Sequence, residues 1–498
     1  MITIIYSTHK DEEYNNKFKQ HLLQTVGLDN VQILQYQNNN QYSLAQVYNS
    51  GITESIYDIV VCCHNDIKLE KNWGKKLLED FSNNPEFGII GKAGSCYFPS
   101  SGIYWERMNK TMVGQVYHHP IGQTKWLNTY SSKLPFIVPV VTIDGLFMSF
   151  NKNKILHKFD ESFGKFHFYD HGFCLPNYIN DVKIGVTSSF EITHQSVGQP
   201  NQEFFDSKEK FLRKFGSFLP IDLKPKTIFV EKIENHDLKN NSKVAVIIPT
   251  KGNTELLHSC IESFYQHCNP SSFQIFVADT GSSQEEKEWI KNNILNLGEI
   301  KFIEYDYYNF AKINNDVVQN HVDDSFEYVL FCNNDIKLLN DVILGLINTF
   351  RKFPNTGTVG CRLHYADNTV QHDGIGATMN PNKLLEFGHK FMGSYYHYSI
   401  NTKEILGNTA ALMMMRKNLF LKLGMFNTNY STCFEDVEIN LKCLISGHKN
   451  YLSGNCVAYH YESKTRNRGS DKEKEDYHNF LVPFVNKNIH KFMNKLIL

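Results

Sequence analysis

Two aspartates in this sequence follow matching apolar runs, at places where a carboxylate could hold a metal ion. Residues 59–69 read IVVCCHNDIKL and residues 328–338 read YVLFCNNDIKL, so both runs end in Asn-Asp-Ile-Lys-Leu. The aspartates are Asp66 and Asp335, and carboxylate oxygens are ligands that Mg²⁺ and Mn²⁺ prefer. A single Asn-Asp-Ile sequence after a strand is also typical of a turn in which the side chain bonds the backbone.

Two further pairs of polar residues repeat at nearly the same distance along the chain. The aspartates just described are 269 residues apart, whereas Asp170 and Asp436, like His194 and His460, are 266 apart. Three pairs at nearly one offset indicate that the two halves are duplicates, which favours a shared chemical role over a turn. For each histidine, a purely structural role is the alternative. A histidine nitrogen beside the carboxylate would favour Mn²⁺ over Mg²⁺.

The elements that would position these residues alternate between strands and helices. In the second half, the strands VAVIIPT and FQIFVADT are followed by helical patterns at 254–267 and 284–296. This alternation predicts an open, mostly parallel α/β sheet. Because ligands of such sheets bind at the carboxyl ends of the strands, we expect Thr250, Asp279 and Asp335 to line one crevice.

A chain of 498 residues is too long for one ordinary core, and the duplication predicts two tandem domains. Two prolines, at 220 and 225, and the polar run NHDLKNNS at 235–242 interrupt the pattern between the halves. We expect a first domain at 1–222, a linker at 223–242, a second domain at 243–470 and an amphipathic helical tail at 471–498.

Charge and cysteine usage narrow the class of protein. Lys plus Arg (51) nearly equals Asp plus Glu (52), so no overall positive field points to nucleic acid. The 11 cysteines form no paired framework, as expected of reduced thiols in the cytoplasm. The first residues lack the basic stretch of a signal peptide, and the longest apolar stretch, 134–150, is too short and too polar to span a bilayer. We therefore expect a cytoplasmic protein.

The C-terminal tail carries an apolar helical stripe with lysines beside it. The stripe consists of Val485, Ile489, Phe492, Met493, Leu496 and Ile497, and the lysines are Lys487, Lys491 and Lys495. Such a helix either packs on the core of its domain, which we slightly favour, or rests on the anionic inner face of the cell membrane.

The second half resembles the family 2 glycosyltransferases, especially those of bacterial O-antigen and capsule synthesis. From residue 243 to about residue 465, the matching pieces are VIIPT at 246–250, VADTGS at 277–282, NND at 333–335, GNTAA at 407–411, LGMF at 423–426, FEDVE at 434–438 and His460. The first half, to about residue 215, is similar to a more divergent glycosyltransferase-2-like family, through HND at 64–66, VTIDGLFM at 141–148, FYDHGFC at 168–174 and ITHQS at 192–196. The resemblance implies two tandem GT-A domains, each with a Rossmann-like, mostly parallel α/β sheet.

In this family the reaction is inverting transfer of a sugar from a nucleotide donor, with a divalent metal on the diphosphate. The resemblance assigns Mn²⁺ or Mg²⁺ to Asp66, His194, Asp335 and His460. Both halves depart from the D-x-D motif of the family, because its first position holds His64 or Asn333. One carboxylate with diphosphate oxygens and waters can still complete an octahedral site.

The resemblance places the catalytic base in the acidic pair Glu435-Asp436. The matching position in the first half is Asp170, whose neighbour is Tyr169 rather than a carboxylate, so the base is assigned to Asp436 and Asp170. A general base takes the proton of the acceptor hydroxyl and typically contributes about 10²–10⁴-fold to the rate. The structural alternative is that each aspartate caps the helix that follows it.

The nucleotide is expected at the ends of the first strands of each half. The resemblance assigns it to Thr250, Asp279 and Asn334 in the second half, and to Thr8 and Asn65 in the first. The first half shows no equivalent of the Ala-Asp-Thr sequence around Asp279, and we expect it to be shorter there. Neither half contains a Gly-rich phosphate loop, which argues against a dehydrogenase or a nucleotidyltransferase.

These expectations combine into a bifunctional, metal-dependent transferase. It would move sugars from UDP-, dTDP- or GDP-sugars to a glycan or lipid-linked glycan acceptor of a capsule or lipopolysaccharide, and any membrane contact would be peripheral. The alternative is that only the second domain is catalytic, and that the first is a degenerate module for acceptor binding or scaffolding.

Overall fold

The computed structural model describes residues 1–234, 242–382, 384–462 and 470–492, and the chain divides into two compact units. The first unit contains Met1–Lys224 with Ser394–His397, and the second contains Pro225–Gly393 with Tyr398–Leu498. Residues 225–234 of the predicted linker belong to the second unit, where Glu231 O accepts a bond from Asn340 Nδ2 (2.8 Å). Residues 235–241 of that linker lie outside the described part of the chain.

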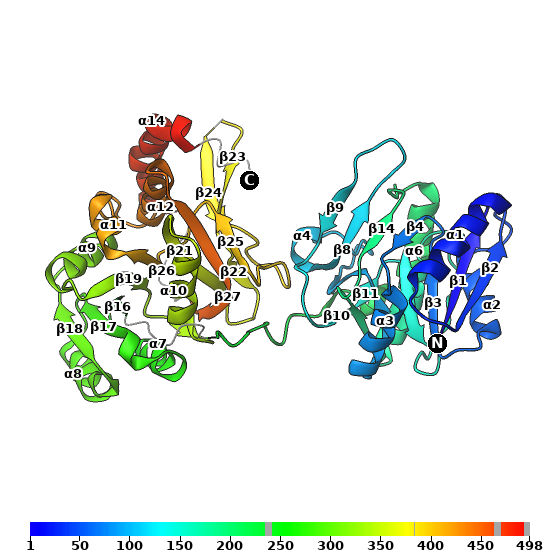
Figure 1. Cartoon of the computed structure of the whole chain (residues 1–498), viewed down its shortest axis with the longest axis horizontal. Coiled ribbons are helices and arrows are strands. Elements are labelled where there is room, and N and C mark those ends of the chain that lie inside the picture. Colours follow the sequence, from blue (N-terminus) through cyan, green and yellow to red (C-terminus); the bar gives the residue numbers. More distant parts are fainter. Residues whose placement is uncertain (235–241, 383, 463–469, 493–498) are drawn as a thin grey trace. The chain divides into compact units, whose positions relative to one another are not determined.

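The main sheet of the first unit has the strand order β10-β13-β5-β12-β3-β1-β2. Figure 1 labels β1, β2, β3 and β10 of this sheet. β12 runs antiparallel to its neighbours β3 and β5, whereas β1 is parallel to β2 and β3. The bounds are β1 Ile2–Thr8, β2 Val31–Gln37, β3 Ile59–Cys63, β5 Phe87–Gly91, β10 Val138–Val140, β12 Phe147–Asn151 and β13 Lys183–Val186.

A smaller sheet of the first unit has the order β11-β6-β8-β14-β4, with β9 on β8, and β7 pairs with β15. The bounds are β4 Ile67–Leu69, β6 Ala93–Ser95, β7 Tyr97–Phe98, β8 Met112–His118, β9 Trp126–Thr129, β11 Thr142–Ile143, β14 Ile192–His194 and β15 Ile221–Asp222. The helices are α1 Glu12–Thr25, α2 Leu44–Glu54, α3 Trp73–Asn83, α4 Met108–Thr111, α5 Tyr169–Ile179, α6 Gln202–Phe215 and the 3₁₀ turn η1 Gly216–Phe218.

The main sheet of the second unit has the order β18-β17-β16-β19-β26-β21-β27-β20, with β22 on β21 and β25 on β27. The strands are β16 Lys243–Thr250, β17 Phe273–Asp279, β18 Ile300–Glu304, β19 Phe326–Cys332, β20 Ile336–Leu338, β21 Thr356–His364, β22 Val370–His372, β25 Thr402–Ile405, β26 Leu412–Arg416 and β27 Lys449–His460. β23 (Ile375–Met379) and β24 (Leu385–His389) form a separate hairpin.

Helices cover both faces of this sheet, because its strands bury side chains on both sides (Figure 1). In β16, Val244, Val246 and Ile248 belong to one apolar cluster, whereas Ala245 and Ile247 belong to the other. The helices are α7 Thr254–His267, η2 Pro270–Ser272, α8 Gln284–Asn293, η3 Leu295–Leu297, α9 Phe310–Asn320, α10 Val342–Lys352, α11 Lys417–Lys422, α12 Glu435–Ile445, α13 Asp471–Asp476, the π-helical turn η4 Tyr477–Leu481 and α14 Val482–Phe492.

The two units share one strand skeleton, which confirms the duplication and the predicted tandem α/β folds. The main sheet of the first unit is mixed rather than mostly parallel, because β10 and β12 run antiparallel to their neighbours. The order β2-β1-β3-β12-β5-β13 in the first unit corresponds to β17-β16-β19-β26-β21-β27 in the second. The parallel and antiparallel relations also agree, since β26, like β12, runs against both of its neighbours. The second unit adds α8 and β18 beyond β17, so the first is shorter there, as expected.

The described part of the tail packs on its own unit. Val485 and Phe492 are buried and Ile489 lies against the same apolar cluster, which includes Val437 and Leu441 of α12. This is the core-packing alternative for that part of the stripe, and residues 493–498 lie outside the described residues. Among the described helices, none is long and apolar enough to cross a bilayer.

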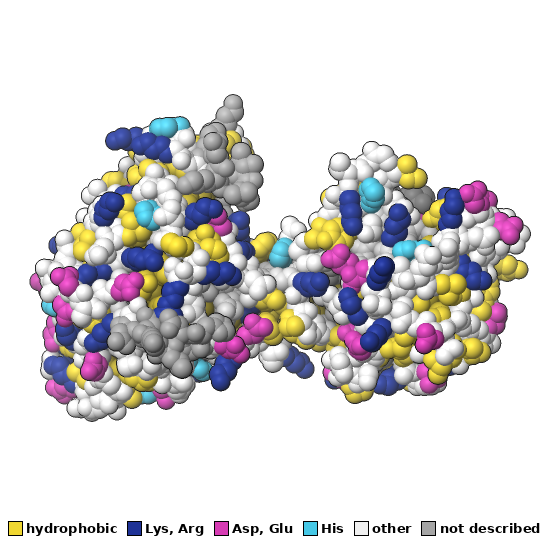
Figure 2. Space-filling model, viewed as in Figure 1, with side chains coloured by type: hydrophobic (Ala, Val, Ile, Leu, Met, Phe, Trp, Pro, Cys, Tyr) yellow, Lys and Arg dark blue, Asp and Glu magenta, His cyan; other side chains and the backbone are white. Residues whose placement is uncertain are grey.

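The surface carries both signs of charge, in keeping with the formal net charge of −1. Figure 2 shows Lys and Arg side chains interspersed with Asp and Glu side chains on the visible face of each unit. That face therefore presents no large basic surface of the kind that binds nucleic acid.

Lys92 in the first unit provides a test of the packing. It is 2% exposed, and its ammonium donates to the backbone oxygens of Thr187 (2.8 Å) and Phe190. Burial lowers the pKa of Lys92 to about 7. Because the unfolded lysine keeps its proton up to a pKa of about 10.4, the stability of this unit should rise with pH between about 7 and 10.

We expect the free energy of unfolding to increase by about 2 kcal/mol from pH 7 to pH 9 through Lys92 alone. Lys92→Met should lack this increase, whereas Lys71→Met, at an exposed position, should keep it. Urea unfolding followed by tryptophan fluorescence is suitable, because three of the four tryptophans lie in the first unit. Equal pH slopes for Lys92→Met and the wild type would contradict the prediction.

Candidate functional site

Each unit brings one of the predicted aspartates against one of the predicted histidines. β4 follows Asp66 and pairs antiparallel with β14, so that Ile67 lies opposite His194. β20 and β27 repeat this pairing in the second unit. The carboxylate Oδ1 consequently lies 3.3 Å from the imidazole Nε2 in the Asp66–His194 pair, and 3.1 Å in the Asp335–His460 pair.

The first unit adds a third group to this pair. Ligand atoms of His64, Asp66 and His194 all lie within 4.8 Å of one another, the single such group of three within the described chain. Two imidazoles and a carboxylate form a donor set suited to a transition metal such as Mn²⁺. In the sequence, His64 stood out only as a departure from D-x-D, and its place at the first position of that motif was the available signal for a ligand.

The charges of the first site are coupled. Burial would raise the pKa of Asp66, but hydrogen bonding to His194 and the charges of His194 and His64 outweigh it and hold that pKa well below its usual range. For His194, burial acts to lower the pKa, and the Asp66 carboxylate more than compensates and raises it. The pKa of His64 is lowered by burial and by His194. The site thus favours an ionised carboxylate, and a cation bound here would take the place of the proton on His194.

The second site has a different third residue. Asn333 replaces His64, and its Nδ2 lies 3.3 Å from His460 Nε2. His460 Nδ1 lies 2.7 Å from Gln371 Oε1, an amide oxygen that accepts only, which assigns the proton of the neutral ring to Nδ1. The Nε2 lone pair then faces the carboxylate of Asp335, an arrangement that a shared cation or a protonated ring stabilises. Asp335 and His460 therefore fit a cation site completed by substrate oxygens.

Asp170 and Asp436 occupy equivalent places in the first turns of α5 and α12. Asp170 Oδ2 accepts a bond from the backbone N–H of Gly145, and Asp436 Oδ2 accepts one from that of Ala410, both at 3.1 Å. Neither aspartate is the N-cap residue, because Phe168 and Phe434 hold that position without a side-chain cap bond. The aspartates therefore do not cap their helices from the N-cap position, although each accepts a bond from the next N–H of the first turn.

The residues beside these aspartates differ in a correlated way. Tyr169, at the position of Glu435, places its hydroxyl 2.8 Å from His64 Nε2. A Cβ atom on Gly145 would collide with that hydroxyl, so this position must be glycine beside a tyrosine. In the second unit the equivalent position is Ala410, next to Glu435. Glu435 is half-buried at the start of α12.

A further acidic residue lies beside the first site and was given no role by the sequence analysis. Asp144 Oδ2 accepts a bond from the hydroxyl of Tyr104 (2.7 Å), and Oδ1 accepts one from the backbone of Leu146 (2.9 Å). Its position in the VTIDGLFM stretch, one residue before Gly145, was the signal. The aligned residue in the second unit is Thr409, whose hydroxyl lies 3.3 Å from Ala411 N.

The residues assigned to the nucleotide make matching bonds in both units. Asn65 Nδ2 donates to Thr8 Oγ1 and Asn334 Nδ2 donates to Thr250 Oγ1, each over 2.9 Å. Each bond ties the residue before Asp66 or Asp335 to the end of the first strand of its unit. The threonine and asparagine positions are thus brought together, as the sequence predicted.

Asp279 is buried at the end of β17, where it accepts long bonds from the backbone of Ser282 (3.3 Å) and lies 3.7 Å from Lys287. The first half lacks the Ala-Asp-Thr sequence, as expected, but the register of its first two strands places another residue at the position of Asp279. β2 pairs with β1 so that Gln37 lies opposite Thr8, just as Asp279 lies opposite Thr250. The next residues also agree, since Asn38 N donates to Thr8 O (2.7 Å) and Thr280 N to Thr250 O (2.8 Å).

Comparisons with known proteins place both halves of the chain among glycosyltransferases. A family described as "Glycosyltransferase like family" matches residues 3–215, and "Glycosyl transferase family 2" matches residues 245–424. The second match ends before Asp436 and His460. The O-antigen biosynthesis protein RfbC of Myxococcus xanthus is 25% identical over 244 residues, which cover 46% of this chain and 18% of that protein. The chain thus spans less than a fifth of the length of this relative.

Two solved structures are similar to this chain at lower sequence identity. GalNAc-T7 with UDP, GalNAc and Mn²⁺ gives a TM-score of 0.40 at 14% identity, covering 52% of this chain and 51% of that chain. The mannosyltransferase PcManGT from Pyrobaculum calidifontis with GDP-Man and Mn²⁺ gives 0.36 at 16% identity, covering 53% and 68%.

The metal assignment can be tested by making the first site resemble the second. His64→Asn gives the first unit the Asn-Asn-Asp sequence of the second and removes one of three candidate ligands. We expect Mn²⁺ affinity to fall roughly 10-fold or more, measured by electron paramagnetic resonance with UDP present. All proteins compared also carry Asp335→Asn, which removes the carboxylate of the second site, so that only the first site binds the metal. Lys68→Ala, at an exposed neighbouring position, is the control. Unchanged affinity would show that His64 is not a ligand.

Proposed function

Because residues 3–215 and 245–424 form two tandem glycosyltransferase domains of the family 2 type, we propose that both are metal-dependent and that the chain is bifunctional. One observation carries this proposal: the bonds around the assigned residues recur in both units with nearly the same lengths. They are the threonine–asparagine bond, the aspartate–histidine contact and the backbone bond to the first-turn aspartate. A degenerate domain would be under no constraint to keep this set.

The residues of each site support inverting transfer from a nucleotide sugar. A divalent cation, held by Asp66 and His194 with His64, or by Asp335 and His460, would neutralise the diphosphate as it leaves. Asp170 or Asp436 takes the proton of the acceptor hydroxyl, while the hydroxyl oxygen bonds the anomeric carbon and the bond to the diphosphate breaks. The products are the glycoside and a nucleoside diphosphate.

Two features hold the carboxylate of the proposed base in place. A backbone N–H donates to that carboxylate, and the aspartate lies in the first turn of a helix. Its remaining oxygen accepts from the next backbone N–H, over 2.9 Å in Asp170 and 2.7 Å in Asp436. These bonds fix the direction in which the carboxylate faces the acceptor.

The two halves differ where the nucleotide is expected, which supports two different donors. Asp279 offers a carboxylate that only accepts hydrogen bonds, whereas Gln37 offers an amide that both donates and accepts. The alternative function, with catalysis in the second domain alone, rests on this same difference. We prefer two donors because the remaining contacts of the first site are kept.

The acceptor is a growing surface polysaccharide or its lipid-linked precursor, of a capsule or lipopolysaccharide. The similarity to an O-antigen biosynthesis protein supports this class of acceptor. A cytoplasmic location, with peripheral contact at the inner face of the membrane, would give the chain access to both nucleotide sugars and lipid-linked glycans.

The first test separates the two catalytic sites. Asp170→Asn and Asp436→Asn should each remove one transfer step and spare the other, with a loss of about 10²–10⁴-fold, because an amide cannot take the proton. Transfer is measured as the nucleoside diphosphate released from a panel of UDP-, GDP- and dTDP-sugars with glycan acceptors. Asp206→Asn, on the exposed face of α6, is the control. Wild-type transfer of every sugar by Asp170→Asn would leave only the second domain catalytic.

The second test concerns the metal. EDTA should abolish both transfer steps, and Mn²⁺ should restore them at least as well as Mg²⁺, because each site pairs a carboxylate with an imidazole. The same release of nucleoside diphosphate measures the effect. Full activity of either step in excess chelator would remove the metal assignment for that domain.

A further inference from the structure

A buried carboxylate at the C-terminal end of the second unit holds the loop in front of the proposed base. Asp476, the last residue of α13, is 2% exposed. It accepts backbone bonds from three consecutive residues, Ser431 (3.0 Å), Thr432 (2.7 Å) and Cys433 (3.2 Å). The hydroxyl of Ser431 adds a fourth donor (3.1 Å). Consecutive backbone N–H groups around one anion form a strong and directional contact.

The loop that Asp476 holds leads directly into the proposed catalytic helix. Cys433 is followed by Phe434, whose φ of 77° lies in the left-handed region, and then by Glu435 and Asp436. A bulky residue adopts that conformation only where its surroundings enforce it. The bonds to Asp476 fix the three residues before this turn and therefore the direction in which α12 begins.

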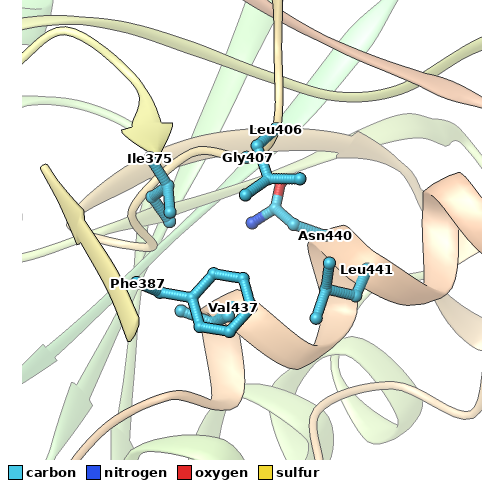
Figure 3. A pocket seen from close by; sticks show the side chains of 7 residues that line it. All are labelled: Ile375, Phe387, Leu406, Gly407, Val437, Asn440 and Leu441. Carbon is cyan, nitrogen blue, oxygen red and sulfur yellow. The ribbon is translucent and has the colours of Figure 1, made fainter. Parts of the chain in front are cut away.

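The same C-terminal segment also fixes the body of α12. Leu481, Val485 and Phe492 of η4 and α14 share an apolar cluster with Val437 and Leu441 of α12. On the side of the β23–β24 hairpin, Ile375 and Phe387 face those two α12 residues across a small apolar gap (Figure 3). Packing thus holds the body of α12, and the bonds to Asp476 hold the loop that leads into its first turn.

The first unit repeats this arrangement with different residues. Glu203, in the first turn of α6, accepts backbone bonds from Lys165 (2.6 Å) and Phe166 (3.4 Å). These two residues precede Phe168, which has a φ of 62°, at the same distance as Ser431 and Thr432 precede Phe434. In both units the carboxylate comes from a helix that follows the strand of the metal-site histidine, β14 or β27.

We propose that Asp476 and Glu203 are positioning residues, which clamp the loops at 431–433 and 165–166 so that Asp436 and Asp170 face the acceptor hydroxyl. This inference rests on the proposed function of those two aspartates as bases. A base acts only within about 2.6–3.2 Å of the proton it takes, and a misplacement of about 1 Å can cost about 100-fold in rate. Loss of the clamp should therefore lower kcat and leave binding of the donor unchanged.

The experiment compares Asp476→Ala and Asp476→Asn with Asp471→Ala, an exposed residue in the first turn of the same helix. Hydrogen exchange of the peptide around residues 431–433 should be faster in Asp476→Ala and intermediate in Asp476→Asn, which keeps one acceptor oxygen. The donor is the nucleotide sugar, from the UDP-, GDP- and dTDP-sugar panel, whose turnover Asp436→Asn lowers. For it, kcat should fall roughly 10- to 100-fold in Asp476→Ala at unchanged KM.

A double mutant separates positioning from general destabilisation. If Asp476 acts through Asp436, adding Asp476→Ala to Asp436→Asn should lower kcat no further, because the base is already absent. Faster exchange with unchanged kcat, or losses that multiply in the double mutant, would overturn the inference while the base assignment stands. Full activity of Asp436→Asn, or no turnover of any sugar by the wild type, would overturn the proposed function and the inference with it.

The first unit provides a second variant in case Asp476→Ala does not fold. Glu203 is half-buried at a helix start, so Glu203→Ala should fold, and Asp206→Ala on the exposed face of α6 is its control. Glu203→Ala should speed exchange around residues 164–166 and lower kcat for the sugar that Asp170→Asn affects. An unchanged kcat in Glu203→Ala would contradict the clamp in the first unit.

Discussion

The short antiparallel pairing of β4 with β14, and of β20 with β27, is the constraint on which both sites depend. It brings an aspartate that follows an early strand against a histidine at the end of a late one, more than a hundred residues further along the chain. Closing so long a loop costs chain entropy, and the surrounding sheet offsets that cost. The close approach of carboxylate and imidazole is therefore a consequence of the strand order.

The side chains around this aspartate–histidine pair differ between the two units, and the differences fit one another. In the first unit a tyrosine at 169 reaches His64, and the room for its hydroxyl exists only because residue 145 is glycine. In the second unit the equivalent residues are Glu435, Asn333 and Ala410. Three positions that are distant in sequence thus differ together because their side chains share one space, while the aspartate beside them keeps the same backbone bond.

The strands and most of the polar residues at their ends could be predicted from the sequence, for a physical reason. Strands buried on both faces read as continuous apolar runs, and a polar residue after such a run marks the edge of the sheet. Gln37 was missed because its strand ends without an acidic residue, and only the register of β1 with β2 reveals it. The bonds of Asp476 and Glu203 were missed because such contacts join distant segments and leave no periodic pattern.

Phe168 and Phe434 have left-handed backbone conformations, which are unfavourable for a bulky residue, directly before the helices that carry Asp170 and Asp436. A non-glycine residue in this region costs roughly 1–2 kcal/mol, and both units keep one directly before the helix that carries the proposed base. The ring of Phe168 is buried among aromatic side chains, and that of Phe434 packs near Tyr477, so apolar burial offsets the strain. A right-handed conformation at this residue would begin the helix in another direction and take its aspartate away from the backbone N–H of residue 145 or 410. The strain is therefore tied to the direction of the carboxylate, which explains why it is kept in two units whose neighbouring side chains have changed.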